Sequence, residues 1–539
     1  VIPDTKKIPS DGVADVVVSG QLADVLPLVD IIVSARNSET KIPQILGAGE
    51  VALTASVSFS MVKNGGDSVE IFAKGDVKNF EGELGDTGAV ISSDLVQIAL
   101  TPKQLELTGT GRFDQVPFTA KFQKGLGPDQ ADVPALLEAE LDLSSELVNR
   151  FTEAEIEGLI SGSSPARITA SLPSGAEASF SLSSDLVGLG VNAKQINWQK
   201  PAKKPIQFLL TGRYNTRALT DQFSLTGAGL NLEGTVVYAE PGEFKSLSVS
   251  KLRVDDTLDV FGKFDPAMGV EIFGGWLNFP NLMAGMPETS GAQTAPLALK
   301  VALDEVVLGE NKLTEFRADL ISAPQLSGPF SAKVNGVAHI EAVLSPLYGR
   351  TALDVTSEQA GRLLTSVGAL QSATGGRLKL NLSPTQQMGE TDGLLEIRNV
   401  KVQKAPVFAE LLNAISIVGL LEQLTGPGIL LTEVDAKFRS TEEEIIVESA
   451  SAFGPSIGLS LDGYYNRKAE SLDMQGVLSP IYFINGIGSA LTRKGDGLFG
   501  FSFNLDGKKG EPSLEVNPLS ILTPGIFRDV FRRPPPKLE

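Results

Sequence analysis

The side chains that could do catalytic chemistry are few and widely separated in this chain. His339 is the only histidine among 539 residues, and there is no cysteine. These counts exclude a thiolate nucleophile, a disulfide, and a metal site built from cysteine or from several histidines. A hydrolytic triad would have to use His339, which lies in the strand-like segment 334–344. We interpret it as a residue on a sheet face, and expect no metal and no other cofactor.

The acidic residues offer no convincing catalytic pair either. Two clusters, Asp255-Asp256 and Glu442-Glu443-Glu444, have the character of turns or solvated edges and lack a glycosidase-like context. The chain is therefore not expected to be an enzyme. Its formal net charge of -19 would repel a phosphate backbone, and no basic stripe carries interleaved aromatic residues. Nucleic acid is not an expected partner.

Most of the chain from Val51 onward alternates apolar and polar residues with a period of two. The segments 116–122 and 207–214 are examples, in which one set of side chains is apolar and the other is rich in Lys, Glu, Ser and Thr. Glycine and proline, 55 and 31 residues, supply turns at short intervals. This pattern predicts a mostly β fold in which an antiparallel sheet has one apolar and one solvated face.

Large apolar side chains on the period-two face are the candidate functional residues, because side by side they would line a continuous apolar surface. The candidates are Phe118, Phe122, Phe180, Phe208, Leu210, Phe264, Phe438, Phe499, Phe501 and Phe503. An alternative exists for each strand, since the same faces could close on each other as ordinary sandwiches or barrels.

One pattern occurs twice: a strand, a capping serine, a short helix and a returning strand. The helices are predicted at 146–151 and 358–364, and the looser pattern over 20–59 is a candidate third copy. Each unit is too small to own a core, so we expect one sheet extended unit by unit. The small, polar segment 285–296 is the candidate boundary, which gives domains of 1–290 and 291–539.

The segment 405–428 predicts the one long helix, with Pro406 in its first turn and a Gly-Pro-Gly stop at its end. Its helical core is 405–424. Apolar residues occupy about half of the helical wheel, so the helix must pack against other elements on more than one side. We expect it to plug or cap one end of an apolar groove through four residues: Phe408, Leu411, Ile415 and Val418.

The C-terminus predicts a second helix, over 519–533, with an apolar and a basic side. Phe527 and Phe531 share the apolar side, while Arg528, Arg532 and Arg533 concentrate positive charge. We call this amphipathic segment the C-terminal foot. It could contact anionic lipid head groups or a partner protein. The alternative is a small terminal helix that caps the last strands before the proline-rich tail.

No run approaches the ~18 to 20 continuous apolar residues of a membrane span. The chain begins at Val1, with neither an initiator methionine nor a signal peptide. We expect it to be a processed chain or a piece of a longer protein.

Several segments resemble the AsmA-like family of envelope proteins of double-membraned bacteria, the group that contains YhdP and TamB relatives. SEQAGRLL at 357–364, with the Gly375-Gly376 return, resembles the family's Ser-x-x-Ala-Gly-x-x-Leu helix, and APVFAELL at 405–412 resembles its Ala-Pro-x-Leu-x-x-Leu-Leu helix. WQKP at 198–201 is similar to a signature of the longer members. The C-terminal pattern is matched at 478–480, Asn485, 516–520 and 523–525.

This resemblance implies a bridge-like lipid carrier of the periplasm. Family members have an inner-membrane helix, which this chain lacks, followed by a long curled antiparallel sheet whose concave face is a hydrophobic groove. It implies phospholipids or other acyl-chain lipids as cargo. It also implies anchoring in the inner membrane and contact with the outer membrane, or a partner there, at the C-terminal end.

With strands ~4.8 Å apart, some 20 to 30 of them would give a groove on the order of 100 Å long. Acyl chains would lie in it, while head groups stay in water. The competing hypothesis is a scaffold or assembly factor for outer-membrane proteins that acts through exposed strand edges.

Overall fold

The computed structural model describes most of the chain. The described residues are 11–25, 27, 47–60, 69–83, 90–130, 132–152, 158–173, 177–214, 219–240, 243–285, 296–415, 418–480, 499–508, 511–523 and 532–538. They form two compact units. Unit 1 comprises Val1–Ala267 with Asn281–Met286, and unit 2 comprises Met268–Pro280 with Pro287–Glu539.

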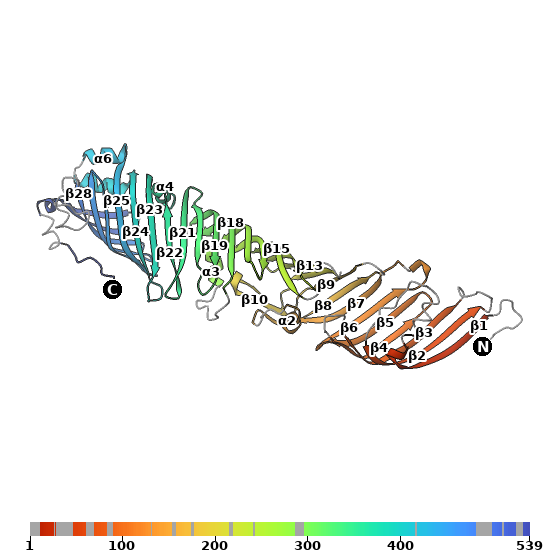
Figure 1. Cartoon of the computed structure of the whole chain (residues 1–539). Coiled ribbons are helices and arrows are strands. Elements are labelled where there is room, and N and C mark those ends of the chain that lie inside the picture. Colours follow the sequence, from red (N-terminus) through yellow and green to blue (C-terminus); the bar gives the residue numbers. More distant parts are fainter. Residues whose placement is uncertain are drawn as a thin grey trace. The chain divides into compact units, whose positions relative to one another are not determined.

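Unit 1 is built from strands that mostly lie side by side in the order of the sequence (Figure 1). Its strands are β1 (Asp11–Gln21), β2 (Gly47–Ser60), β3 (Glu70–Glu83), β4 (Val90–Leu100), β5 (Gln104–Phe113), β6 (Val116–Gly125), β7 (Ala135–Ser144), β8 (Ile160–Leu172), β9 (Ala178–Ser184), β10 (Leu189–Ala193), β11 (Trp198–Lys200), β12 (Gln207–Tyr214), β13 (Leu219–Gly227), β14 (Leu230–Tyr238), β15 (Phe244–Val254) and β16 (Leu258–Asp265). Its helical segments include η3 (Pro128–Gln130), α2 (Ser145–Thr152) and η4 (Lys194–Ile196), and residues 22–25 after β1 are also helical.

Unit 2 is built in the same way, from consecutive strands and short helices. Its strands are β17 (Gly269–Asn278), β18 (Ala298–Leu308), β19 (Asn311–Ile321), β20 (Gly328–Val334), β21 (Ala338–Leu347), β22 (Arg350–Ser357), β23 (Ser372–Pro384), β24 (Thr391–Gln403), β25 (Ile429–Ser440), β26 (Glu444–Phe453), β27 (Ile457–Asn466), β28 (Ser471–Pro480), β29 (Phe501–Lys508) and β30 (Glu511–Asn517). Its helices are α4 (Ala360–Ser366), α5 (Pro406–Ala414), α6 (Val418–Thr425) and η6 (Pro518–Leu522).

The predicted fold class is confirmed: the protein is mostly β, with open, mostly antiparallel sheet and few short helices. Each strand pairs mainly with its neighbours in the sequence, as β2 does with β1 and β3. One skip occurs where β9 pairs with β12, because β10 and β11 form a small separate sheet on the start of β8.

One of the strand pairings between described residues is parallel, which the sequence did not predict. β17 and β18 run in the same direction, with Val270 beside Leu299. Parallel neighbours need a crossover rather than a hairpin. The chain between β17 and β18 contains α3 (Phe279–Gly285) and residues 286–295. Of these, only 286–295 lie outside the described residues. The predicted boundary at 290/291 falls in this crossover, whereas β17 belongs to unit 2.

Alternation along the strands gives the sheet its two different faces. In β21, Ala338, Ile340 and Ala342 are buried, while the intervening His339 and Glu341 are exposed. Directly opposed residues of an antiparallel pair point to the same face. Ile340 opposes Ala332 of β20, so buried positions continue from strand to strand. We call this side the apolar face and the other the polar face.

The predicted serine cap is present at α2, whereas at α4 the N-cap is Gln359 and the predicted serine lies two residues earlier. Ser144 Oγ accepts a hydrogen bond from the Leu147 N–H at 3.4 Å, at the start of α2. Before α4, Ser357 Oγ accepts from the Gln359 N–H at 3.1 Å and donates to the His339 carbonyl at 2.7 Å. Each serine thus ends a strand, but only Ser144 caps the helix that follows; Ser357 instead ties the turn before α4 to β21.

The Ala-Gly pair of α4 has a packing role. Ala360 is fully buried, and a Cβ on Gly361 would collide with the backbone of Thr374 in β23. The helix can therefore lie directly on the sheet only with glycine at this position. This contact explains why the SEQAGRLL segment carries a glycine inside a helix.

The predicted single helix over 405–424 is wrong in one respect, because the chain forms two helices. α5 ends at Ala414, with Ile415 as its C-cap, and α6 starts at Val418. The segment 415–418, Ile-Ser-Ile-Val, combines β-branched residues and serine, which have low helix propensity. Residues 416 and 417 lie outside the described residues.

The core of unit 2 encloses these two helices. Leu411, Leu412, Leu420 and Leu424 share one buried cluster with apolar-face residues of β23, β24, β27, β28 and β29. α5 contacts β30, whereas α6 contacts β24 and β25. Strands that are far apart in the ladder therefore meet around the helices, so this part of the sheet is curled.

The WQKP segment anchors the small sheet of β10 and β11 in unit 1. Trp198 Nε1 donates to the Ala228 carbonyl at 2.9 Å. Lys200 is buried, and its Nζ donates to the carbonyls of Leu186 and Leu189, both at 2.6 Å. Burial lowers the pKa of Lys200. These carbonyls have the charge-assisted partner that buried backbone groups need.

Candidate functional site

The apolar face of unit 1 is continuous across neighbouring strands. Phe118 of β6 opposes Leu141 of β7, and Phe180 of β9 opposes Ala170 of β8. Phe208 opposes Leu225 of β13. The strand registers place all six predicted lining residues of this unit on the one face: Phe118, Phe122, Phe180, Phe208, Leu210 and Phe264.

These side chains are half-buried rather than enclosed. All six have intermediate exposure, although they point to the apolar side. The main contacts of helix α2 are to β7 and β8, where its Leu147 is buried. The middle strands of unit 1 thus keep large apolar side chains partly in water, a cost that an apolar ligand could remove.

The predicted residues of unit 2 fall into different environments. Phe438 is half-buried on the apolar face of β25, and Phe501 is half-buried on β29. Phe503 is 6% exposed and belongs to the core cluster. Phe499 precedes β29 and is exposed, and its carbonyl accepts a hydrogen bond from Ser479. Of these four residues, only Phe438 and Phe501 lie where they could line an open apolar face.

Two of the predicted groove-end helix residues have described side chains. Leu411 is buried in the core cluster, and Ile415 packs against it. The side chains of Phe408 and Val418 lie outside the described residues. The helix pair therefore lies on the apolar face, where it occupies the interior of the curled sheet.

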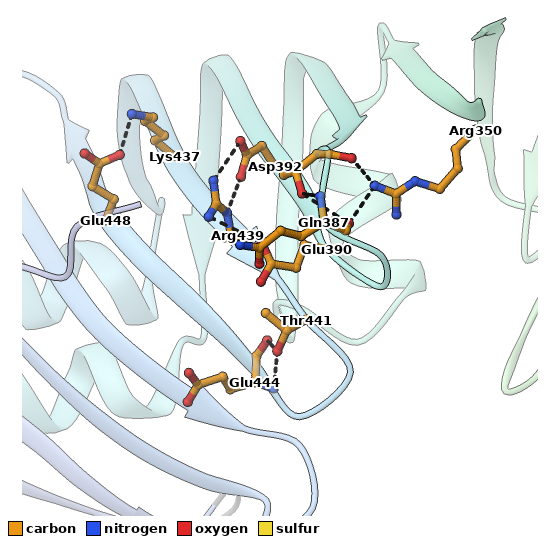
Figure 2. Close-up of polar contacts among 10 residues, drawn as sticks. Arg350, Gln387, Glu390, Asp392, Lys437, Arg439, Thr441, Glu444 and Glu448 are labelled. Carbon is orange, nitrogen blue, oxygen red and sulfur yellow. Dashed lines mark hydrogen bonds and ion pairs between the residues drawn. The ribbon is translucent and has the colours of Figure 1, made fainter. Parts of the chain in front are cut away.

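The polar face carries ion pairs between neighbouring strands, drawn in part in Figure 2. Arg439 Nε donates to Asp392 Oδ1 at 2.7 Å, and Arg439 Nη1 lies 3.4 Å from Glu390 Oε2. The hydrogen bond with Asp392 raises the pKa of Arg439. Lys437 pairs with Glu448 at 2.5 Å. These carboxylates are held by cations across the strands, an arrangement suited to stabilising a sheet rather than to acid–base catalysis.

A carboxylate also lies on the apolar face. Asp221 of β13 opposes Gly212, the same glycine that opposes Phe180. Burial raises the pKa of Asp221, and burial together with Asp221 raises the pKa of its hydrogen-bond partner Tyr238 to about 12. Sequence reasoning missed Asp221, although its place in the period-two pattern of β13 marks its face.

Replacing Asp221 with asparagine tests this environment. With a raised pKa, the folded chain binds the proton more tightly than the unfolded chain. Stability from this group is therefore lost as pH rises through its folded pKa, and ionised Asp221 costs stability at neutral pH. We expect Asp221→Asn to melt at a higher temperature than the natural chain at pH 7.5, and the gain to shrink toward pH 4. An equal gain at both pH values would contradict the assignment.

The C-terminal arginines contact the sheet. Arg532 Nη2 lies 2.6 Å from Asp462 Oδ1, and the two side chains are 4% and 5% exposed. Arg533 donates two hydrogen bonds to Asp473, at 2.7 and 3.1 Å, in an exposed pair. Both acids lie on the polar face, because Asp462 opposes Gln475 while Leu461 and Gly476 belong to the apolar side. The other foot residues, Phe527, Arg528 and Phe531, lie outside the described residues.

The remaining candidate groups, His339 and the Glu442–Glu444 cluster, are surface residues. His339 is exposed on the polar face, and Glu443 pairs with Lys468 in the turn before β26. Within the described ranges, no three His, Asp or Glu side chains are gathered as a metal site would require. In the same ranges, no helix combines the length and hydropathy of a membrane span.

A shallow hollow of about 710 Å³ lies over β17–β22. Its lining includes polar-face residues such as Lys300, Arg317, Glu341 and Asp354, so charges of both signs surround it. Apolar residues such as Phe273 and Val343 also line the hollow, but an acyl chain bound there would have to cover these charged side chains. The apolar face is therefore the stronger candidate site.

Comparisons of the chain with protein-family models, with curated proteins and with solved structures found no match. The AsmA-like resemblance accordingly stays a prediction.

Proposed function

We propose that this protein binds acyl-chain lipids along its apolar face and carries them between two membranes. The observation that supports this proposal is the in-register, half-buried apolar face of unit 1, backed by a polar face. Removing one methylene from water is worth about 0.8 kcal/mol, so a lipid with two long chains would bind well. No catalytic group is needed.

A uniform lining also suits movement. Successive strands present similar Leu, Val and Phe side chains at a regular spacing of about 4.8 Å. A chain that shifts by one strand exchanges one set of apolar contacts for an equivalent set, so the barriers stay low. The direction of movement would come from partners or gradients at the ends.

The AsmA-like resemblance supports a more specific form of this proposal. In that form the protein is a periplasmic bridge for phospholipids, anchored in the inner membrane in the full-length protein and reaching the outer membrane or a partner there. The resemblance rests on the segments at 357–364 and 405–412, and on the C-terminal pattern.

The direct test is the lipid content of the purified chain. We expect native mass spectrometry and solvent extraction to find co-purified phospholipid, and fluorescent phospholipid to move between donor and acceptor vesicles faster when the protein is present. A protein that is lipid-free, takes up no added phospholipid and leaves the vesicle exchange rate unchanged would refute the proposal.

A second candidate function, assembly of outer-membrane proteins on exposed strand edges, is favoured by β1. This strand pairs with β2 alone among the described strands, and its Val17 is 78% exposed. Photo-crosslinking residues placed at Val17 and at Phe208 would separate the two functions. Protein adducts at Val17 would support assembly, whereas lipid adducts at Phe208 would support lipid binding.

A further inference from the structure

Five phenylalanine rings on the apolar face each lie against a glycine of the neighbouring strand. In every case the two residues oppose each other directly in the ladder, and a Cβ on the glycine would come closer than 3.0 Å to ring carbons. The pairs are Phe118–Gly111, Phe180–Gly212, Phe223–Gly234, Phe438–Gly393 and Phe503–Gly476. The absence of a side chain on the glycine lets each ring lie on the backbone of the next strand.

Two of these glycines meet side chains alone. For Gly393, the three atoms nearest to an added Cβ all belong to the Phe438 ring. For Gly212, they belong to the Phe180 ring and the Asp221 carboxylate. At Gly111, Gly234 and Gly476 the atom nearest to an added Cβ is a backbone carbonyl oxygen. An alanine at Gly393 would thus act on the ring alone, whereas an alanine at Gly212 would displace the Asp221 carboxylate as well as the Phe180 ring.

We infer that the four pairs with half-buried rings, those of Phe118, Phe180, Phe223 and Phe438, set the clearance above the apolar face, so that an acyl chain can pass over each ring; the Phe503 ring is buried in the core and takes no part. This inference rests on the proposed lipid binding. An alanine at Gly393 would push the Phe438 ring off the sheet. The backbone closes one side, so the ring can move only toward the space over the apolar face, where it would obstruct a bound chain.

The pairs could instead serve stability alone, since an aromatic ring covering a strand glycine compensates for the missing side chain. The two roles predict different results. A purely stabilising pair would, when disturbed, change the melting temperature without a specific change in lipid contact. A clearance role predicts a local loss of lipid contact that removal of the ring restores.

The test uses the full chain with vesicles of phosphatidylethanolamine and phosphatidylglycerol that contain a phospholipid with a photoactivatable acyl chain. After irradiation, adducts are mapped by mass spectrometry onto peptides from β24 and β25 and onto peptides from β12 and β13. For Gly393→Ala we expect about tenfold fewer adducts on β24 and β25, with β12 and β13 unchanged. In Gly393→Ala/Phe438→Leu, which lacks the ring, adducts should recover to at least half of the natural level.

The comparison is repeated in unit 1 with the single variant Gly212→Ala and the double variant Gly212→Ala/Phe180→Leu. A folding failure at one position therefore does not decide the result. Melting curves of all variants report folding. If the natural chain forms adducts and both glycine variants form as many, the inference is overturned while the proposed function stands. If the natural chain forms none, both are overturned. A loss that persists in both ring-free double variants would also overturn the inference.

Discussion

Phe208→Glu is expected to lower the phospholipid content of the purified chain at least about tenfold while the protein stays folded. Phe208 is half-buried on the apolar face and opposes Ser184 and Leu225. A carboxylate there can keep its water while the face is empty. It must be desolvated or protonated when an acyl chain covers it, which costs more than the 1.4 kcal/mol that corresponds to tenfold in affinity.

The matched control is the next residue in the strand. Leu209 is apolar like Phe208 but points to the polar face, where it is 44% exposed. Leu209→Glu adds the same charge to the same strand and should leave lipid content unchanged. The comparison is made by lipid extraction and circular dichroism on both variants. Unfolding of Phe208→Glu alone would indicate a closed protein core at this position and would count against the open apolar face.

Arg532→Ala should destabilise the C-terminal part of unit 2 by about 3–5 kcal/mol, the usual cost of leaving one member of a buried ion pair alone. Asp462 is 5% exposed at its side chain and would lose its 2.6 Å contact with Arg532. Gln475 Nε2 also donates to Asp462 and to the Arg533 carbonyl, both at 2.7 Å. The loss should therefore spread to β27, β28 and residues 532–538.

The adjacent arginine provides the control for this second prediction. Arg533 pairs with Asp473 where both side chains are more than half exposed, so Arg533→Ala should cost about 1 kcal/mol or less. Hydrogen exchange of the β27 and β28 amides distinguishes the two variants. Equal protection in both would mean that the Arg532–Asp462 pair does not hold the C-terminal segment on the sheet.

Period two in the sequence predicted the sheet well because burial on one face forces alternation. It located Phe208 and Leu210 on the apolar face without knowledge of their partners. Alternation indicates that one face is solvated, which favours antiparallel sheet as a whole, but it does not fix the direction of a single strand relative to its neighbour. For that reason the pairing of β17 with β18 could not be predicted.

Features that depend on register were also out of reach. Gly393 and Phe438 lie in different strands, and nothing local marks them as a pair. The basic tail showed the same limit: Arg532 and Arg533 suggested a surface for anionic partners, but their carboxylate partners lie far back in β27 and β28. The break after Ala414 had a local signal, the β-branched residues that follow it, which the apolar periodicity outweighed.

Pairing between consecutive strands has an evolutionary consequence. Through most of the ladder a strand touches the one before and the one after, as β3 touches β2 and β4. A hairpin inserted or deleted there restores both strand direction and side-chain alternation for everything that follows. Duplication or loss of a short stretch of gene could thus lengthen or shorten such a sheet two strands at a time, with its apolar residues still on one side.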